Sequence, residues 1–104
     1  MIVWSEKLYI GEQAEKNFKK LQKKLENGKL VPGVFLVTRP SNESNLFDIL
    51  PATEILFPHY KRTELLVYGL AKGKDEAEGL VLSMLEDVCR EMGGLYCKEY
   101  FESE

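Results

Sequence analysis

The sequence contains few of the residues from which metal centres and disulfide frameworks are built. It has one histidine, His59, and two cysteines, Cys89 and Cys97, in 104 residues. These are too few ligands for a zinc cluster, and two cysteines do not make a disulfide framework. We therefore expect no metal and no cofactor. We interpret the cysteines as buried free thiols, which implies a reducing compartment.

Long apolar runs are also missing. The longest, Leu65–Ala71, is about a third of what a membrane helix needs. The first seven residues have no basic region followed by an apolar stretch, so they do not form a secretion signal. We expect a cytoplasmic protein with no membrane contact.

The length and composition are those of one globular domain, spanning residues 1–104. Hydrophobic residues make up 44% of the chain, charged residues 30%, and the formal net charge is −3. A disordered chain would have fewer apolar residues and a larger net charge.

Two segments are apolar without polar alternation, Val34–Thr38 and Leu65–Leu70. Strands of this kind are covered on both faces, as in parallel sheets. Helices are predicted over residues 12–27, ended by Gly28, and over residues 75–92, where apolar residues recur at helical spacing.

The remaining segments are predicted from the positions of their prolines and charged residues. Pro51 divides the apolar stretch 46–57, so two short helical pieces are expected at about 45–50 and 51–57, with Pro58 ending the second. Residues 95–101 are predicted to form a last strand. Lys98 and Glu99 in its middle indicate an edge position.

This alternation of helices and strands predicts an α/β fold with a small three-stranded, mostly parallel sheet covered by helices. The alternative makes Leu8–Ile10 a first strand and gives an α+β ferredoxin-like plait with an insertion at 39–63. A connection that long between paired antiparallel strands is unusual, so we favour the parallel arrangement.

Polar and basic side chains follow both apolar strands. If the strands are parallel, their exits lie at one sheet edge, where α/β folds bind ligands. A site for a small phosphate-bearing anion would then use Arg39, Ser41, Asn42, Lys72 and Lys74. Against this hypothesis, three carboxylates open the helix that follows the second strand, and they repel an incoming anion. These are Asp75, Glu76 and Glu78.

The first predicted helix has a basic face opposite its apolar stripe. It consists of Lys16, Lys19, Lys20, Lys23 and Lys24. Such a face binds phosphate backbones or acidic partners, or is simply solvated. The pairs Glu12–Lys16 and Glu15–Lys19 at i,i+4 spacing would neutralise part of its charge. The sequence pI is about 5.3, so nucleic acid is not the partner we expect first.

No residue set is typical of catalysis. His59 lies in an aromatic and basic loop without an identifiable partner, and no Ser or Cys stands in a nucleophile motif. Cys89 falls late in a helix, where nothing lowers the pKa of its thiol. We therefore do not expect an enzyme.

The density of apolar residues in 46–57 predicts either a core crossover or a covered surface. We favour a non-catalytic interaction or regulatory module that self-associates, through this segment or the sheet edge at 95–101, as a homo-oligomer or with an unknown protein partner. Anion binding at the strand exits and weak nucleic-acid binding by the basic face are the alternatives. The candidate interface residues are Leu46, Phe47, Leu50, Leu56 and Phe57.

The run from Leu66 to Ala77, with Asn45–Ile49 upstream, resembles a group of small bacterial proteins of about this length. Their shared stretch is a strand that ends in a Gly-x-Ala-x-Gly turn before a Glu-Ala helix. Here that turn is Gly69–Gly73. The similarity would cover residues 30 to 100. The group has no assigned activity, so the resemblance implies only a similar α/β architecture and no catalytic residues.

Overall fold

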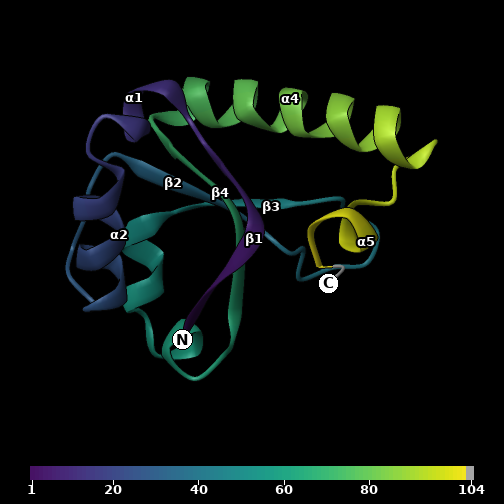
Figure 1. The fold of residues 1–104 in the computed structure, drawn as a ribbon. Helices are drawn as coiled ribbons and strands as arrows, with labels where there is room; N and C mark the ends of the chain where they lie inside the picture. The colour runs from purple at the N-terminus through teal and green to yellow at the C-terminus, as the bar shows by residue number, and fades with distance from the viewer. Residues whose placement is uncertain (103–104) are drawn as a thin grey trace.

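A twisted four-stranded sheet forms the centre of the molecule in the computed structural model, which describes residues 1–102 (Figure 1). In space the strands follow the order β1-β4-β2-β3. β1 runs parallel to β4, whereas β2 is antiparallel to both β4 and β3. The strand bounds are β1 Ile2–Ile10, β2 Val34–Thr38, β3 Asp48–Pro51 and β4 Leu65–Lys72.

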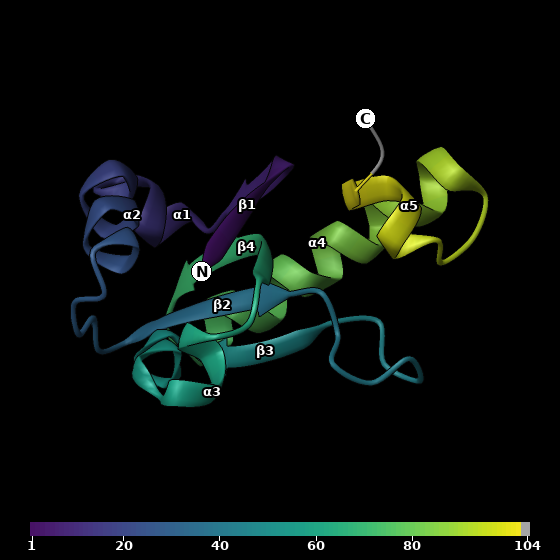
Figure 2. The same cartoon turned by 90° about the horizontal axis from the view of Figure 1, so that it is seen from below.

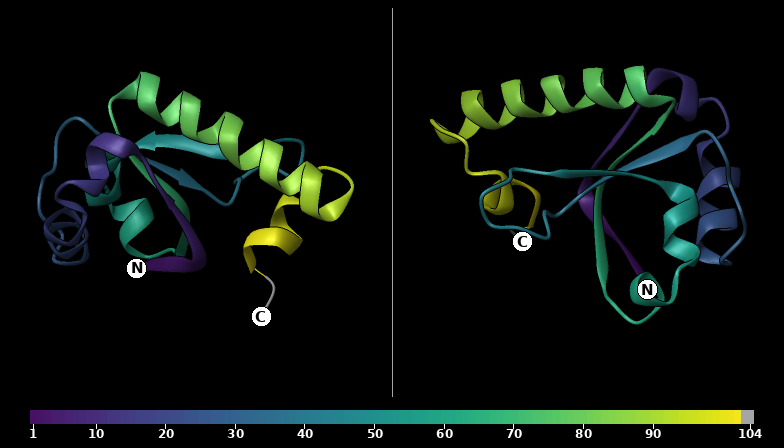
Figure 3. Two further views of the ribbon diagram at one scale, coloured as in Figure 1. Left: turned by 45° about the horizontal axis from the view of Figure 1, so that its top comes forward. Right: turned by 180° about the vertical axis from the view of Figure 1, so that it is seen from behind.

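Helices cover both faces of this sheet (Figures 1 and 3). On one face lie α2, the 3-10 helix η1 and the short α3; on the other, α4 crosses the strands and α5 packs near its C-terminal end. A short helix, α1, precedes α2. The helix bounds are α1 Glu12–Glu15, α2 Phe18–Glu26, η1 Ala52–Leu56, α3 Pro58–Lys61, α4 Lys74–Met92 and α5 Cys97–Glu102.

Alternate residues of β2 and β4 supply two separate apolar cores. Leu36 and Val67 are fully buried beneath α2 and η1, whereas Val37 and Tyr68 are fully buried beneath α4 and α5. Because successive strand residues point to opposite faces, an uninterrupted apolar run is what two covered faces require. The sequence-based prediction that both faces of these strands are covered is confirmed.

The prediction of a mostly parallel, three-stranded sheet is wrong. β2 and β4 are adjacent but antiparallel, with Val34 opposite Lys72 and Thr38 opposite Val67. The only parallel pair among the described strands is β1 with β4. Covering by helices accounts for the apolar pattern whichever way neighbouring strands run, so the pattern does not determine strand direction.

Part of the alternative plait is present. Residues Leu8–Ile10 belong to β1, and β2 and β4 pair antiparallel as that topology requires. The long connection 39–63 has secondary structure of its own. It contains β3, which pairs with the free side of β2, and then η1 and α3, which return the chain to β4.

The two helical pieces predicted at 45–50 and 51–57 are wrong in the first half. Residues Asp48–Pro51 form β3, and only Ala52–Leu56 is helical, as a 3-10 turn. Pro51 fits the end of an edge strand because no neighbour needs its missing N–H. As predicted, the second piece ends before Pro58: η1 ends at Leu56, and Phe57 is extended. Pro58 then begins α3, where proline's fixed φ suits the first helical position.

The last predicted strand, 95–101, is also wrong, since residues Cys97–Glu102 form α5. Its three buried side chains are Cys97, Tyr100 and Phe101. Their spacing of three and four residues places them on one face of a helix. The sheet edge proposed at 95–101 for self-association is therefore not present.

The predicted helix 12–27 is interrupted. Asn17, with φ −138° and ψ 36°, separates α1 from α2. Gly28 follows the helix with φ 69°, the left-handed conformation expected for a residue that ends a helix. No helix within the described residues is long and apolar enough to cross a membrane.

Candidate functional site

The five predicted ligand-binding residues lie at opposite ends of the sheet. Arg39, Ser41 and Asn42 follow the end of β2 that pairs with Val67, whereas Lys72 and Lys74 lie at the other end of β4, opposite Val34. An anion site built from both strand exits required parallel strands. Since β2 and β4 are antiparallel, the structure does not bring these residues together.

At the Lys72 end, the chain provides its own anion. The Glu76 carboxylate accepts hydrogen bonds from the backbone N–H groups of Lys72 at 2.9 Å, Gln13 at 2.8 Å and Ala14 at 3.4 Å. Burial raises the pKa of Glu76, but these three donors outweigh it and hold that pKa below its ordinary value. The amides that an external phosphate would use are therefore occupied, so the turn serves as a structural cap.

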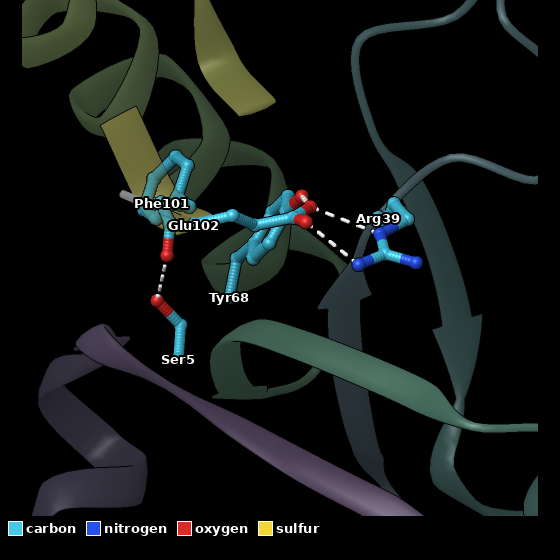
Figure 4. Close-up of polar contacts among 5 residues, drawn as sticks. All are labelled: Ser5, Arg39, Tyr68, Phe101 and Glu102. Atoms are coloured by element: carbon cyan, nitrogen blue, oxygen red, sulfur yellow. Dashed lines mark hydrogen bonds and ion pairs between the residues drawn. The ribbon is translucent and has the colours of Figure 1, made fainter. Parts of the chain in front are cut away.

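At the other end, Arg39 is paired. Its Nε and Nη2 donate to the two carboxylate oxygens of Glu102 at 2.9 and 2.6 Å (Figure 4). Tyr68, from β4, also donates its hydroxyl to Glu102. Burial raises the pKa of Glu102, yet the hydrogen bonds from Arg39 and Tyr68 lower it below its usual range. The charge of Arg39 is thus compensated within the chain.

The same contacts fix α5 against the sheet. The ring of Phe101 stacks on that of Tyr68 with 4.5 Å between centroids and 13° between planes. Its carbonyl accepts a 2.7 Å hydrogen bond from the buried hydroxyl of Ser5 in β1 (Figure 4). Phe47 packs edge-on against both rings. α5 is therefore a fixed wall beside the 39–46 loop.

A cleft of about 610 Å³ lies between the 39–46 loop and residues 95–99. In Figure 2 the loop and α5 project from the same end of the sheet. Three of its lining side chains are large, apolar and exposed: Leu46 at 37%, Leu95 at 52% and Tyr96 at 56%. Two of the predicted ligand residues, Arg39 and Ser41, also line it. Its volume lies within the range of known binding pockets.

The predicted interface residues divide into two groups. Leu50 is buried in the core beneath η1, and Phe47 and Leu56 are half-buried. Leu46 and Phe57 remain exposed, Phe57 at 59%. Leu50 is thus part of the core, whereas Leu46, shortly before β3, and Phe57, directly before α3, stay exposed.

Ile49 is an interface candidate that the sequence reading missed. It lies in β3 opposite Val37, so its side chain points toward the α4 face, and it is 40% exposed. The alternation of exposed Ile49 with buried Leu50 is typical of a strand, but Pro51 favours a helical interpretation of the sequence. Leu95 and Tyr96 were missed because they were assigned to a strand. Tyr68 and Glu102 become neighbours only through the fold.

The candidate catalytic groups are not assembled within residues 1–102. No group of three or more His, Cys, Asp or Glu side chains in that range is placed to hold a metal ion. His59 is exposed and its ring lies edge-on to Tyr60. Cys97 is buried, as predicted, and burial raises the pKa of its thiol, which keeps it protonated at neutral pH. Cys89, predicted to be buried, is exposed because it lies on the solvent side of α4.

Comparison with known protein families, curated proteins and solved structures finds no match for this chain.

Proposed function

We propose that the protein is a non-catalytic interaction module that self-associates through the outer edge of β3 and the apolar surface beside it. One observation carries the proposal. No described residue pairs with the outer side of β3, and the exposed apolar side chains of Ile49 and Leu46 accompany this open edge. An open strand edge with apolar neighbours is a template for pairing with another chain.

The opposite sheet edge is protected. Pairing of β1 with β4 is interrupted between Trp4 and Tyr9, a bulge-like irregularity that disrupts a continuous edge. α5 packs beside this stretch, and the ammonium of Lys7 lies 4.1 Å from the centre of the Tyr100 ring. In β3 the one charged side chain is Asp48, and its carboxylate accepts a hydrogen bond from the Ser41 N–H. These contrasts support β3 as the edge for the proposed association.

A second copy of the chain is the partner that suits this edge. Two β3 strands related by a two-fold axis pair antiparallel, so the same residues meet on both sides and the contact closes on itself. Such pairing extends one sheet through both copies. It also shields Ile49 of each copy from water, which adds an apolar contribution to the backbone hydrogen bonds.

A charge placed in the middle of this edge is expected to prevent association. We predict that the wild-type chain has a mass near twice 11.9 kDa by light scattering at high micromolar concentration. Ile49→Lys should remain at the mass of one copy, because pairing would bury two facing ammonium groups.

Leu82→Lys is the matched control for this experiment. Leu82 is 63% exposed and belongs to α4, not to the β3 strand that forms the proposed contact, so the same change there should leave the dimer intact. A wild-type chain that stays monomeric at the highest concentration contradicts the proposal, as does an Ile49→Lys variant that still dimerises.

A further inference from the structure

The lysines of α2 form a surface that self-association does not use. Lys19, Lys20, Lys23 and Lys24 are all exposed on the side of the helix that faces away from the sheet. Within residues 1–102 the only ion pairs are Arg39–Glu102 and Arg90–Asp87. None of the four lysines is therefore neutralised by a carboxylate in the described part of the chain.

The helix break explains why one of the two expected ion pairs is missing. Glu12–Lys16 and Glu15–Lys19 were predicted as i,i+4 pairs on one helix, but Asn17 interrupts the helix between the members of the second pair. Neither pair forms. The one carboxylate within α2, that of Glu26, accepts a hydrogen bond from the indole of Trp4 in β1 instead. None of these carboxylates therefore forms an ion pair with the four lysines.

Charge is also separated across the molecule. α2 carries four lysines and one glutamate, whereas α4 carries six carboxylates and two basic residues. These helices cover opposite faces of the sheet (Figure 3). The net charge of −3 and the acidic pI therefore average a basic face with an acidic one. The low pI was the main reason not to expect nucleic acid, and it does not describe the surface of α2.

We infer that the exposed lysine face of α2 binds the phosphate backbone of double-stranded nucleic acid without reading its sequence. The apolar residues of α2 are turned into the core, so the face offers only charge and nothing to insert into a bilayer. It contains no arginine and no aromatic residue, which excludes bidentate base recognition and stacking on single strands. Lys19–Lys23 and Lys20–Lys24 form two rows with about 6 Å between members along the helix axis.

Phosphate contacts of this kind have a characteristic salt dependence. For duplex DNA, the binding constant falls with salt at a logarithmic slope of about −0.9 per phosphate neutralised. Four lysines therefore predict that a fourfold rise in salt weakens binding by about 150-fold. With two lysines removed, the same rise should weaken binding by only about 12-fold.

The test measures fluorescence anisotropy of a labelled mixed-sequence duplex DNA over a range of salt concentrations. Lys19→Gln combined with Lys23→Gln should weaken binding at low salt and halve the slope of the logarithm of the binding constant against the logarithm of salt concentration. Glutamine is chosen because it preserves helix propensity. Lys74→Gln combined with Lys98→Gln removes the same charge from exposed positions of α4 and α5, and it should change neither quantity. Circular dichroism checks that both variants are folded.

Three outcomes overturn this inference. The first is no binding of the duplex at low salt. The second is an equal loss of DNA affinity in both double variants, which would show that binding depends on the net charge of the protein and not on the α2 surface. The third is binding to phosphatidylserine vesicles with none to DNA, which would assign the face to membranes. The Ile49→Lys variant should bind DNA through the same lysines, so failure of self-association and failure of DNA binding are distinguishable.

Discussion

Replacement of Phe101 by alanine is expected to lower the free energy of unfolding by about 3–5 kcal/mol. Phe101 is only 3% exposed. Its ring stacks on Tyr68 and lies edge-on to Tyr9 and Phe47, with centroids 5.6 and 5.8 Å away. Alanine leaves a cavity among rings that are held by the sheet, and they cannot collapse fully to fill it. Urea denaturation followed by circular dichroism measures the change.

Tyr96→Ala is the control for this prediction. Tyr96 precedes α5 and is 56% exposed, so its loss should change stability by less than about 1 kcal/mol. An alternative in which residues 95–101 form an edge strand would alternate buried and exposed positions and treat Tyr96 as equivalent to Tyr100. Tyr100 is only 6% exposed in α5, so equal effects of Tyr96→Ala and Tyr100→Ala would contradict the packing of α5 described above.

The second large effect is expected at Glu76. Glu76→Ala should cost about 2–3 kcal/mol, because the N–H groups of Lys72, Gln13 and Ala14 lose a charged acceptor that joins α1 to the start of α4. Glu78→Ala is the matched control. Glu78 is an exposed carboxylate two residues further along α4, and its loss should cost at most the dipole contribution, about 0.3–1 kcal/mol.

The Glu76 contribution should depend on pH with a definite sign. Its pKa is lower in the folded chain than its ordinary value of 4.5. The contribution is therefore complete above the unfolded pKa and is lost as pH falls through the folded pKa. The stability difference between wild type and Glu76→Gln should narrow as pH falls below about 4.5. A difference that stays constant from neutral pH to pH 3 would contradict an ionised Glu76 in the folded state.

Gly11 provides an independent check of the same contact. A Cβ at this position would lie 2.1 Å from Oε1 of Glu76, so Gly11→Ala must displace the carboxylate. The substitution should destabilise the wild type but have little additional effect in a Glu76→Ala background. A double-mutant cycle over the two positions measures this coupling. Additive effects would show that the methyl group and the carboxylate do not compete for one space.

The elements that the sequence identified are those with a strong local pattern. Val34–Thr38 and Leu65–Leu70 are uniformly apolar, and both are strands. The helix predicted at 75–92 extends from Lys74 to Met92, and Gly93 ends it with φ 73°. In the two strands the apolar composition favours one structure, and in the helix the hydrophobic periodicity and the terminal glycine do so.

Strand direction could not be obtained in this way. The residues of β2 and β4 do not determine whether these strands run parallel. Their relative direction depends on the connection between them, in which β3 reverses the chain after β2. Asp48–Pro51 is short and ends in proline, so its strand character arises from pairing with β2 rather than from propensity. The predicted ligand site failed to assemble for the same reason, because its two halves depended on strand direction.

The error at the C-terminal end was avoidable. Cys97, Tyr100 and Phe101 have helical spacing, but the aromatic residues around them favoured a strand. The pairing of Glu102 with Arg39 and Tyr68 joins three segments that are far apart in the sequence, and only the fold brings them together. Whether Ile49, Leu95 and Tyr96 are buried likewise depends on which other segments pack against them. The periodicity of the sequence does not give that information.

The proposal that β3 is the contact edge is tested most directly by amide hydrogen exchange at low and high protein concentration. Pairing of two β3 strands predicts that exchange of amides in residues 46–50 slows as concentration rises, while exchange along α4 stays the same. The Ile49→Lys variant should show no such change. Exchange in residues 46–50 that is independent of concentration in a wild-type chain that nevertheless dimerises would place the interface elsewhere and contradict the proposal.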